Sequence, residues 1–197
     1  MSIRNSDITA VILAGGQGRR MGGQDKGLIE FEGRLMIEIL IEALENQRLD
    51  IVINANRNQS TYQTYGYPVI SDDLDNFQGP LAGFASAMSV VKTDYILTLP
   101  CDSPKLADNF VARFIEAHNR EQTPICVAND GDRLQPVYAL IDTGLLADLK
   151  QFLQSGERKI DRWYAQHSYA NVDFSTEANM FENINTPEDR QRLLGKN

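Results

Sequence analysis

The chain has 197 residues, of which 42% are hydrophobic and 23% charged, as is usual for a soluble globular protein. We therefore expect residues 1–197 to form a single domain. The formal net charge of −8 disfavours nucleic acid as a partner, because proteins that bind phosphate backbones usually carry a basic surplus. No apolar run approaches the roughly 20 residues of a membrane-spanning helix, so no membrane association is expected. With two cysteines and no signal peptide, we expect a reduced, cytoplasmic protein.

Short apolar runs alternate with helical patterns along the chain. The predicted strands cover 8–13, 51–54, 67–70, 94–99, 125–127 and 134–141, with strand-like pieces near Asn171 and Phe181. Helices are predicted over 36–44, 80–91, 110–115 and 145–153, near Trp163, and from Pro187 onward. Pro136 indicates an edge strand or a bulge. The alternation predicts a three-layer α/β fold with a mostly parallel sheet covered by helices on both faces.

Polar residues follow several predicted strands at the point where each strand ends. A glycine-rich segment follows Leu13, and Asn54, Asp72 and Asp102 stand at or just beyond the ends of later strands. Ligands of open α/β sheets bind beyond the carboxyl ends of the strands. We therefore expect these residues to gather along one edge of the sheet.

The glycine-rich segment has the composition of a phosphate-binding loop. Five glycines between Gly15 and Gly23 would let backbone N–H groups approach phosphates, and Arg20 and Lys26 would neutralise a triphosphate. A P-loop is excluded because no hydroxyl residue follows Lys26. A dinucleotide fingerprint is excluded because Met21 stands where its third glycine belongs.

With these motifs in view, the chain resembles the molybdenum cofactor guanylyltransferases, which are nucleotidyltransferases with a glycosyltransferase-A-like, Rossmann-like fold. The resemblance covers nearly the whole chain. It rests on residues 13–16, 20–23, 25–28, 52–57, 79–83, 100–102, 156–158 and 183–187. It implies transfer of GMP from GTP to molybdopterin or Mo-molybdopterin, with loss of pyrophosphate. We also expect partner proteins that deliver or receive the pterin.

The resemblance also implies roles for particular residues. The nucleotide-binding residues would be Leu13, Ala14, Gly15, Gly16, Lys26, Asn54, Asp72, Gly79 and Asp102. Among them Asp102 would hold Mg²⁺, and Arg20, Lys26 and Asp102 would form the catalytic set. Candidates for binding the acceptor are Arg158, Lys159, Asn183 and Asn185.

Each assignment has a plainer alternative. Asp102 could be a turn residue before a helix, Asp72 a solvated turn charge, and Asn54 a cap of the turn after its strand. Arg158 and Lys159 could lie in a solvated turn, and Asn185 could start the last helix. For the whole protein, the alternatives are a related nucleotidyltransferase that uses CTP or a sugar-phosphate acceptor, and a non-catalytic nucleotide-binding adaptor.

Overall fold

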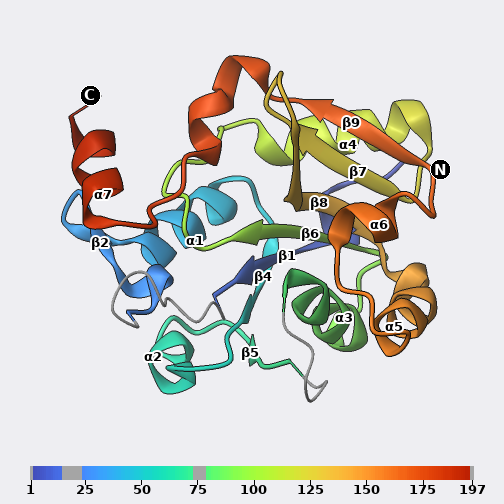
Figure 1. The fold of residues 1–197 in the computed structure, drawn as a ribbon, viewed down its shortest axis with the longest axis horizontal. Helices are drawn as coiled ribbons and strands as arrows, with labels where there is room; N and C mark the ends of the chain where they lie inside the picture. The colour runs from blue at the N-terminus through green and yellow to red at the C-terminus, as the bar shows by residue number, and fades with distance from the viewer. Residues whose placement is uncertain (1, 15–23, 73–78, 196–197) are drawn as a thin grey trace.

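A computed structural model describes residues 2–14, 24–72 and 79–195. Its main sheet has seven strands in the order β5-β4-β1-β6-β8-β7-β9 (Figure 1). The strands are β1 (Ile8–Leu13), β4 (Asp50–Asn54), β5 (Val69–Ile70), β6 (Tyr95–Pro100), β7 (Ile125–Asn129), β8 (Leu134–Asp142) and β9 (Tyr169–Asp173). Only β8 runs antiparallel to its neighbours within this sheet, so the predicted mostly parallel sheet is confirmed.

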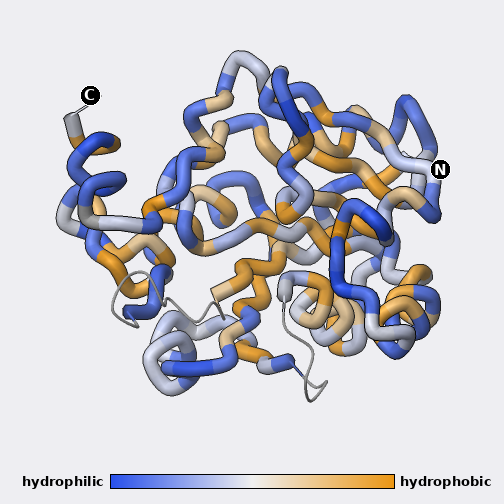
Figure 2. Tube along the Cα trace, viewed as in Figure 1, coloured by the Kyte–Doolittle hydropathy of each residue, from blue (hydrophilic) through white to orange (hydrophobic). Residues whose placement is uncertain are grey.

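Helices cover both faces of the sheet, which gives the three predicted layers. One face carries α1 (Met36–Asn46) and α4 (Phe110–Glu121), and the other carries α3 (Pro80–Val90), α5 (Leu146–Gln154) and α6 (Ile160–Tyr164). Alternation along β1 explains the two cores: Ala10 and Ile12 belong to the cluster that contains α1 and α4, whereas Val11 belongs to the cluster that contains α3 and α5. The strands form the apolar centre in Figure 2, with polar residues on the outer helices.

Three further elements surround the ends of the strands. The short α2 (Gln59–Gln63) lies beside β5, and the hairpin of β2 (Glu30–Phe31) and β3 (Arg34–Leu35) packs with α7 (Pro187–Leu194) around a small apolar cluster. Thr186 caps α7 by accepting a hydrogen bond from the backbone of Asp189 at 3.1 Å. None of the helices in the described ranges has the length and apolar character that crossing a membrane requires.

One local prediction is wrong, and one of two alternatives is confirmed. The piece near Phe181 is a 3₁₀ helix (Ser175–Phe181), because Met180 and Phe181 pack into the same core cluster, whereas consecutive residues of a strand point to opposite faces. The strand that contains Pro136 is not at an edge, since β8 lies between β6 and β7. Pro136 stands in a bulge, which was the other predicted alternative. The register with β7 jumps there from Val127↔Ala139 to Ala128↔Gln135.

Candidate active site

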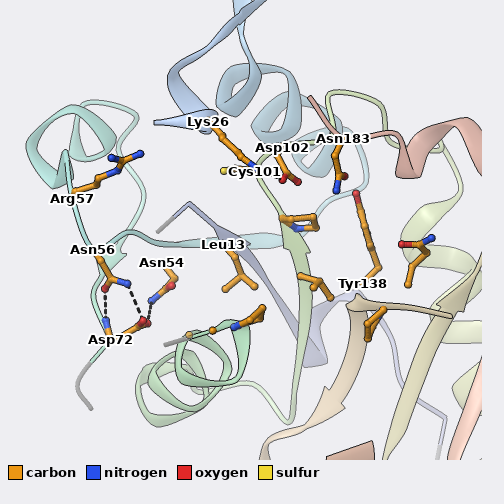
Figure 3. A pocket seen from close by; sticks show the side chains of 17 residues that line it. Leu13, Lys26, Asn54, Asn56, Arg57, Asp72, Cys101, Asp102, Tyr138 and Asn183 are labelled. Carbon is orange, nitrogen blue, oxygen red and sulfur yellow. Dashed lines mark hydrogen bonds and ion pairs between the residues drawn. The ribbon is translucent and has the colours of Figure 1, made fainter. Parts of the chain in front are cut away.

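A cavity of about 710 Å³ opens at the carboxyl ends of β1, β4 and β6 (Figure 3). Residues from distant parts of the sequence line it. They are Leu13, Lys26, Asn54, Asn56, Arg57, Asp72, Gly79, Pro80, Gly83, Pro100, Cys101, Asp102, Gln135, Pro136, Val137, Tyr138 and Asn183. Seven of the predicted site residues are among them, and Gly15, Gly16 and Arg20 lie outside the described residues.

The backbone at the end of β1 joins the three strand ends. The N–H of Ala14 donates to the carbonyl of Asn54 at 2.8 Å, and the N–H of Cys101 donates to the carbonyl of Leu13 at 3.1 Å. Ala14 is itself buried and does not line the cavity. These bonds fix the floor of the site, because each strand end is tied to β1.

One end of the cavity carries a pair of amides around a carboxylate. Asn54 Nδ2 donates to Asp72 Oδ1 at 3.0 Å, and Asn56 Nδ2 donates to Asp72 Oδ2 at 2.8 Å. The backbone N–H of Asp72 donates in turn to Asn56 Oδ1 at 2.8 Å. Asn54 is thus buried against Asp72. The Asp72 carboxylate is fixed by two amide hydrogen bonds and is not a solvated turn charge. Asn56 was not among the predicted site residues, although it lies two positions after Asn54 in the same motif.

Helix α3 approaches this end of the cavity closely because it carries a glycine there. A Cβ on Gly83 would lie 2.8 Å from Asn54 Oδ1 and 2.9 Å from Leu13 Cδ2. Gly79 precedes the helix with a φ of 122°, a conformation that favours glycine. Gly79 was a predicted site residue and Gly83 was not, although both belong to the same Gly-Pro-Leu-Ala-Gly motif.

An ion pair lines the cavity. Lys26 Nζ is 2.8 Å from Asp102 Oδ2, and Lys26 also donates to Asn185 Oδ1. The other oxygen, Asp102 Oδ1, is buried and has no hydrogen-bond partner in the described part of the chain. Asp102 does not cap a helix, because α4 begins only at Phe110. The backbone of Ile184 donates to the Asp102 carbonyl at 2.8 Å, which brings the C-terminal segment to the site.

A second buried carboxylate holds the backbone next to Lys26. Asp25 accepts hydrogen bonds from the Tyr62 hydroxyl at 2.7 Å, from Asn58 Nδ2 at 3.0 Å and from the Gly27 N–H at 3.2 Å. Arg57 Nη2 donates to the carbonyl of Gln24 at 2.8 Å. Asp25 was not among the predicted site residues, because its partners Tyr62 and Asn58 come from α2 and the residue just before it, and α2 was not predicted.

The predicted acceptor residues separate into two groups. Asn183 lines the cavity and accepts from Ser103 Oγ at 2.6 Å, and Asn185 contacts Lys26 instead of capping α7. Arg158 and Lys159 are exposed in the turn between α5 and α6 and do not line the cavity. Their position matches the solvated turn that was the plainer alternative.

The chemistry of the lining groups favours anion binding over nucleophilic catalysis by the protein. Lys26 and Arg57 supply positive charge next to the carboxylates of Asp72 and Asp102. Burial holds the pKa of the Cys101 thiol well above its usual range, so the thiol stays neutral. No group of three or more His, Cys, Asp or Glu side chains able to hold a metal occurs within the described ranges. A metal here would need oxygen ligands from a bound phosphate.

Residues 10–172 match the family model described as the MobA-like NTP transferase domain. The fold is therefore that of a nucleotidyltransferase, a class that generally uses a divalent metal. The molybdenum cofactor guanylyltransferase of Shewanella halifaxensis (strain HAW-EB4) is 50% identical over 188 residues, which cover 95% of this chain and 94% of that protein. The chain belongs to the molybdenum cofactor guanylyltransferase family.

Solved structures agree on the fold. The molybdopterin-guanine dinucleotide biosynthesis protein A from Archaeoglobus fulgidus superposes with a TM-score of 0.78 at 20% identity, over 96% of this chain and 100% of that one. A Mycobacterium tuberculosis H37Rv protein in complex with manganese superposes with a TM-score of 0.69 at 16% identity, over 97% of this chain and 100% of that one. The predicted nucleotidyltransferase fold is confirmed.

Proposed function

We propose that this protein transfers GMP from GTP to molybdopterin, or to its molybdenum-loaded form, and releases pyrophosphate. The family membership supports the reaction class and both substrates. The observation that carries the proposal is the position of the Lys26–Asp102 pair, which lies between the Asn54–Asp72 end of the cavity and the wall formed by Asn183 and Tyr138. The pair thus stands between two groups of polar side chains that line the same cavity (Figure 3).

We assign the Asn54–Asp72 end to the nucleoside of GTP. Each oxygen of Asp72 accepts one amide N–H and has lone pairs left for ligand donors. Backbone groups at Leu13 and Gly79 lie at the same cavity and are our candidates for selecting guanine. Lys26 then faces the phosphates, where its charge offsets the charge that develops as pyrophosphate leaves.

The carboxylate of Asp102 is suited to Mg²⁺. Its Oδ1 is buried without a partner among the described residues, and Mg²⁺ favours one or two carboxylates together with phosphate oxygens and water. When bound, Mg²⁺ would neutralise phosphate charge. Lys26, whose Nζ lies 2.8 Å from the other carboxylate oxygen of Asp102, would orient the phosphates. No side chain needs to remove a proton, because the second pKa of a phosphate monoester is about 6 and the acceptor's phosphate is already largely ionised at neutral pH.

The test is pyrophosphate release with Mg²⁺ and molybdopterin, measured with GTP, CTP and ATP in parallel. We expect release with GTP, and its loss in Asp102→Asn, which keeps the shape of the side chain and removes its charge. Asp94→Asn is the matched control, since Asp94 is exposed at the opposite end of β6. Equal release with CTP would refute the guanine assignment, and GTP binding without release from any nucleotide would favour a non-catalytic adaptor.

We also propose a cytoplasmic location and exchange of the pterin with proteins that deliver or receive it. Cys101 and Cys126 are both buried and unpaired with each other, as is usual for proteins of reducing compartments. A pull-down from cell extract with and without GTP would test for such partners, and recovery of the protein alone in both conditions would contradict the exchange.

A further inference from the structure

The bulge of β8 forms one wall of the cavity. Between the register pairs Val127↔Ala139 and Ala128↔Gln135, the three residues Pro136–Tyr138 leave the ladder with β7, and all three line the cavity. Two buried side chains hold this bulge by its carbonyl groups. Thr98 Oγ1 donates to the carbonyl of Val137 at 2.7 Å, and the Tyr164 hydroxyl donates to the carbonyl of Pro136 at 2.8 Å. The bulge is therefore a fixed feature of the sheet.

The bulge presents the Tyr138 hydroxyl to the cavity. The Tyr138 residue is only 4% exposed, and its ring packs edge-on against Phe181, with ring centroids 4.9 Å apart. Ser103 lies next to the hydroxyl, but Ser103 Oγ donates to Asn183. The hydroxyl forms no hydrogen bond of normal geometry to the described residues, and the neighbouring Ser103 is the one group whose dipole acts on its oxygen. Because buried polar groups are nearly always paired, an unpaired hydroxyl at a cavity wall points to a ligand.

A second unpaired polar atom faces the same corner. Asp102 Oδ1 is also buried without a partner among the described residues, and Figure 3 shows Asp102, Asn183 and Tyr138 directed toward one another. Asp102 Oδ1 is an anionic acceptor, and the Tyr138 hydroxyl is a neutral donor. A phosphate oxygen beside a divalent cation satisfies both, since the cation binds the carboxylate and the oxygen accepts from the hydroxyl.

We propose that Tyr138 binds the acceptor substrate, by donating a hydrogen bond from its hydroxyl to an oxygen of the acceptor's phosphate beside Asp102. The proposal rests on the proposed function and names the residue that positions the attacking group. We assign the Tyr138 hydroxyl to the acceptor's phosphate and not to the nucleotide. The Asn54–Asp72 end, which we assigned to the nucleoside, lies on the other side of Lys26 and Asp102 (Figure 3). Burial raises the pKa of Tyr138 above its usual value, so the hydroxyl stays protonated and acts as a donor.

The first test is Tyr138→Phe in the full chain, with GTP and molybdopterin each varied. We expect the KM for molybdopterin to rise about tenfold or more, as for loss of a hydrogen bond to a charged group, with the KM for GTP unchanged. The free energy of unfolding should not fall, because the lost hydroxyl forms no hydrogen bond of normal geometry to the described residues. Tyr67→Phe is the matched control, since the Tyr67 hydroxyl bonds to Glu45 outside the cavity.

Two results would overturn the proposal: an unchanged KM for molybdopterin, or a rise confined to the KM for GTP. Absence of transfer by the unaltered enzyme would instead refute the proposed function, so the two failures are distinguishable. Thr98→Val tests the bulge separately, because it removes the hydroxyl that holds Val137. We expect Thr98→Val to raise the KM for molybdopterin and Thr98→Ser to restore it, and an unchanged KM in a folded Thr98→Val would refute the positioning role of the bulge.

Discussion

Gly27 gives the sharpest stability test of the network beside Lys26. A Cβ added at Gly27 would lie 2.5 Å from the Tyr62 hydroxyl oxygen, a distance that real Cβ atoms do not tolerate. Tyr62 cannot turn away easily, because it is fully buried and its hydroxyl donates to Asp25 at 2.7 Å. Gly27→Ala should therefore force this hydroxyl off the Asp25 carboxylate.

The expected cost follows from two effects. Overpacking of a tight core position costs about 1–3 kcal/mol, and loss of a hydrogen bond to a charged group costs about 1.5–3 kcal/mol. Tyr62→Phe alone should show only the second effect. In the double variant the hydroxyl is absent, and the next contact of the new Cβ is with the ring carbon Cζ at 3.4 Å. The double variant should therefore be about as stable as Tyr62→Phe alone.

The assay is urea unfolding of the four proteins of this double-mutant cycle, with pyrophosphate release as a second measurement. Gly195→Ala is the matched control, since its Cβ would meet only ordinary contacts of 3.5 Å and longer. A strongly favourable coupling energy is expected between positions 27 and 62. Additive losses in the double variant would refute the claim that the Tyr62 hydroxyl is what requires glycine at position 27.

Two other changes test separate parts of the molecule. Gly83→Ala should raise the KM for GTP about tenfold or more, because its Cβ would displace Asn54, which lies 2.8 Å away, and misplacement of a binding group is costly; an unchanged KM would contradict the nucleoside assignment. Burial lowers the pKa of His118 below its usual value of about 6.5. As pH falls through that value, the unfolded chain takes up the proton first, so stability is lost from about pH 6.5 down to the folded pKa. Unfolding titrations should show a larger loss between about pH 7.5 and about pH 5 in the unaltered protein than in His118→Gln, and equal losses would refute this.

The sheet and its site edge could be predicted because their signals are local. Ile8–Leu13 is an apolar run that ends at a glycine turn, and parallel strands bring their ends to one edge whatever their order in the sequence. Asn54, Asp72 and Asp102 met at one cavity for this reason. Their contacts were less predictable, since the hydrogen bond from Asn54 to Asp72 depends on the register that sets Ile70 of β5 opposite Asn54 of β4 and leaves Asp72 two residues beyond.

Other features depend on tertiary contacts that no local pattern encodes. Pro136 indicated a bulge, but not that three residues leave the ladder or that Tyr138 is thereby aimed at Asp102. Lys159 follows the Gly-Glu-Arg segment (156–158) that supported the resemblance, yet the turn between α5 and α6 leaves it outside the cavity lining. Asn185 was a candidate for the acceptor, and in the structure its side chain contacts Lys26.

The most direct test of the account follows the phosphorus atoms of GTP. Purified protein, Mg²⁺ and molybdopterin would be supplied with GTP that is radiolabelled at either the α- or the γ-phosphate. We expect the α-label to appear in a guanine dinucleotide product and the γ-label in pyrophosphate, in equal amounts. Release of the γ-label as inorganic phosphate, or no transfer of the α-label to molybdopterin, would contradict guanylyl transfer at the cavity around Lys26 and Asp102.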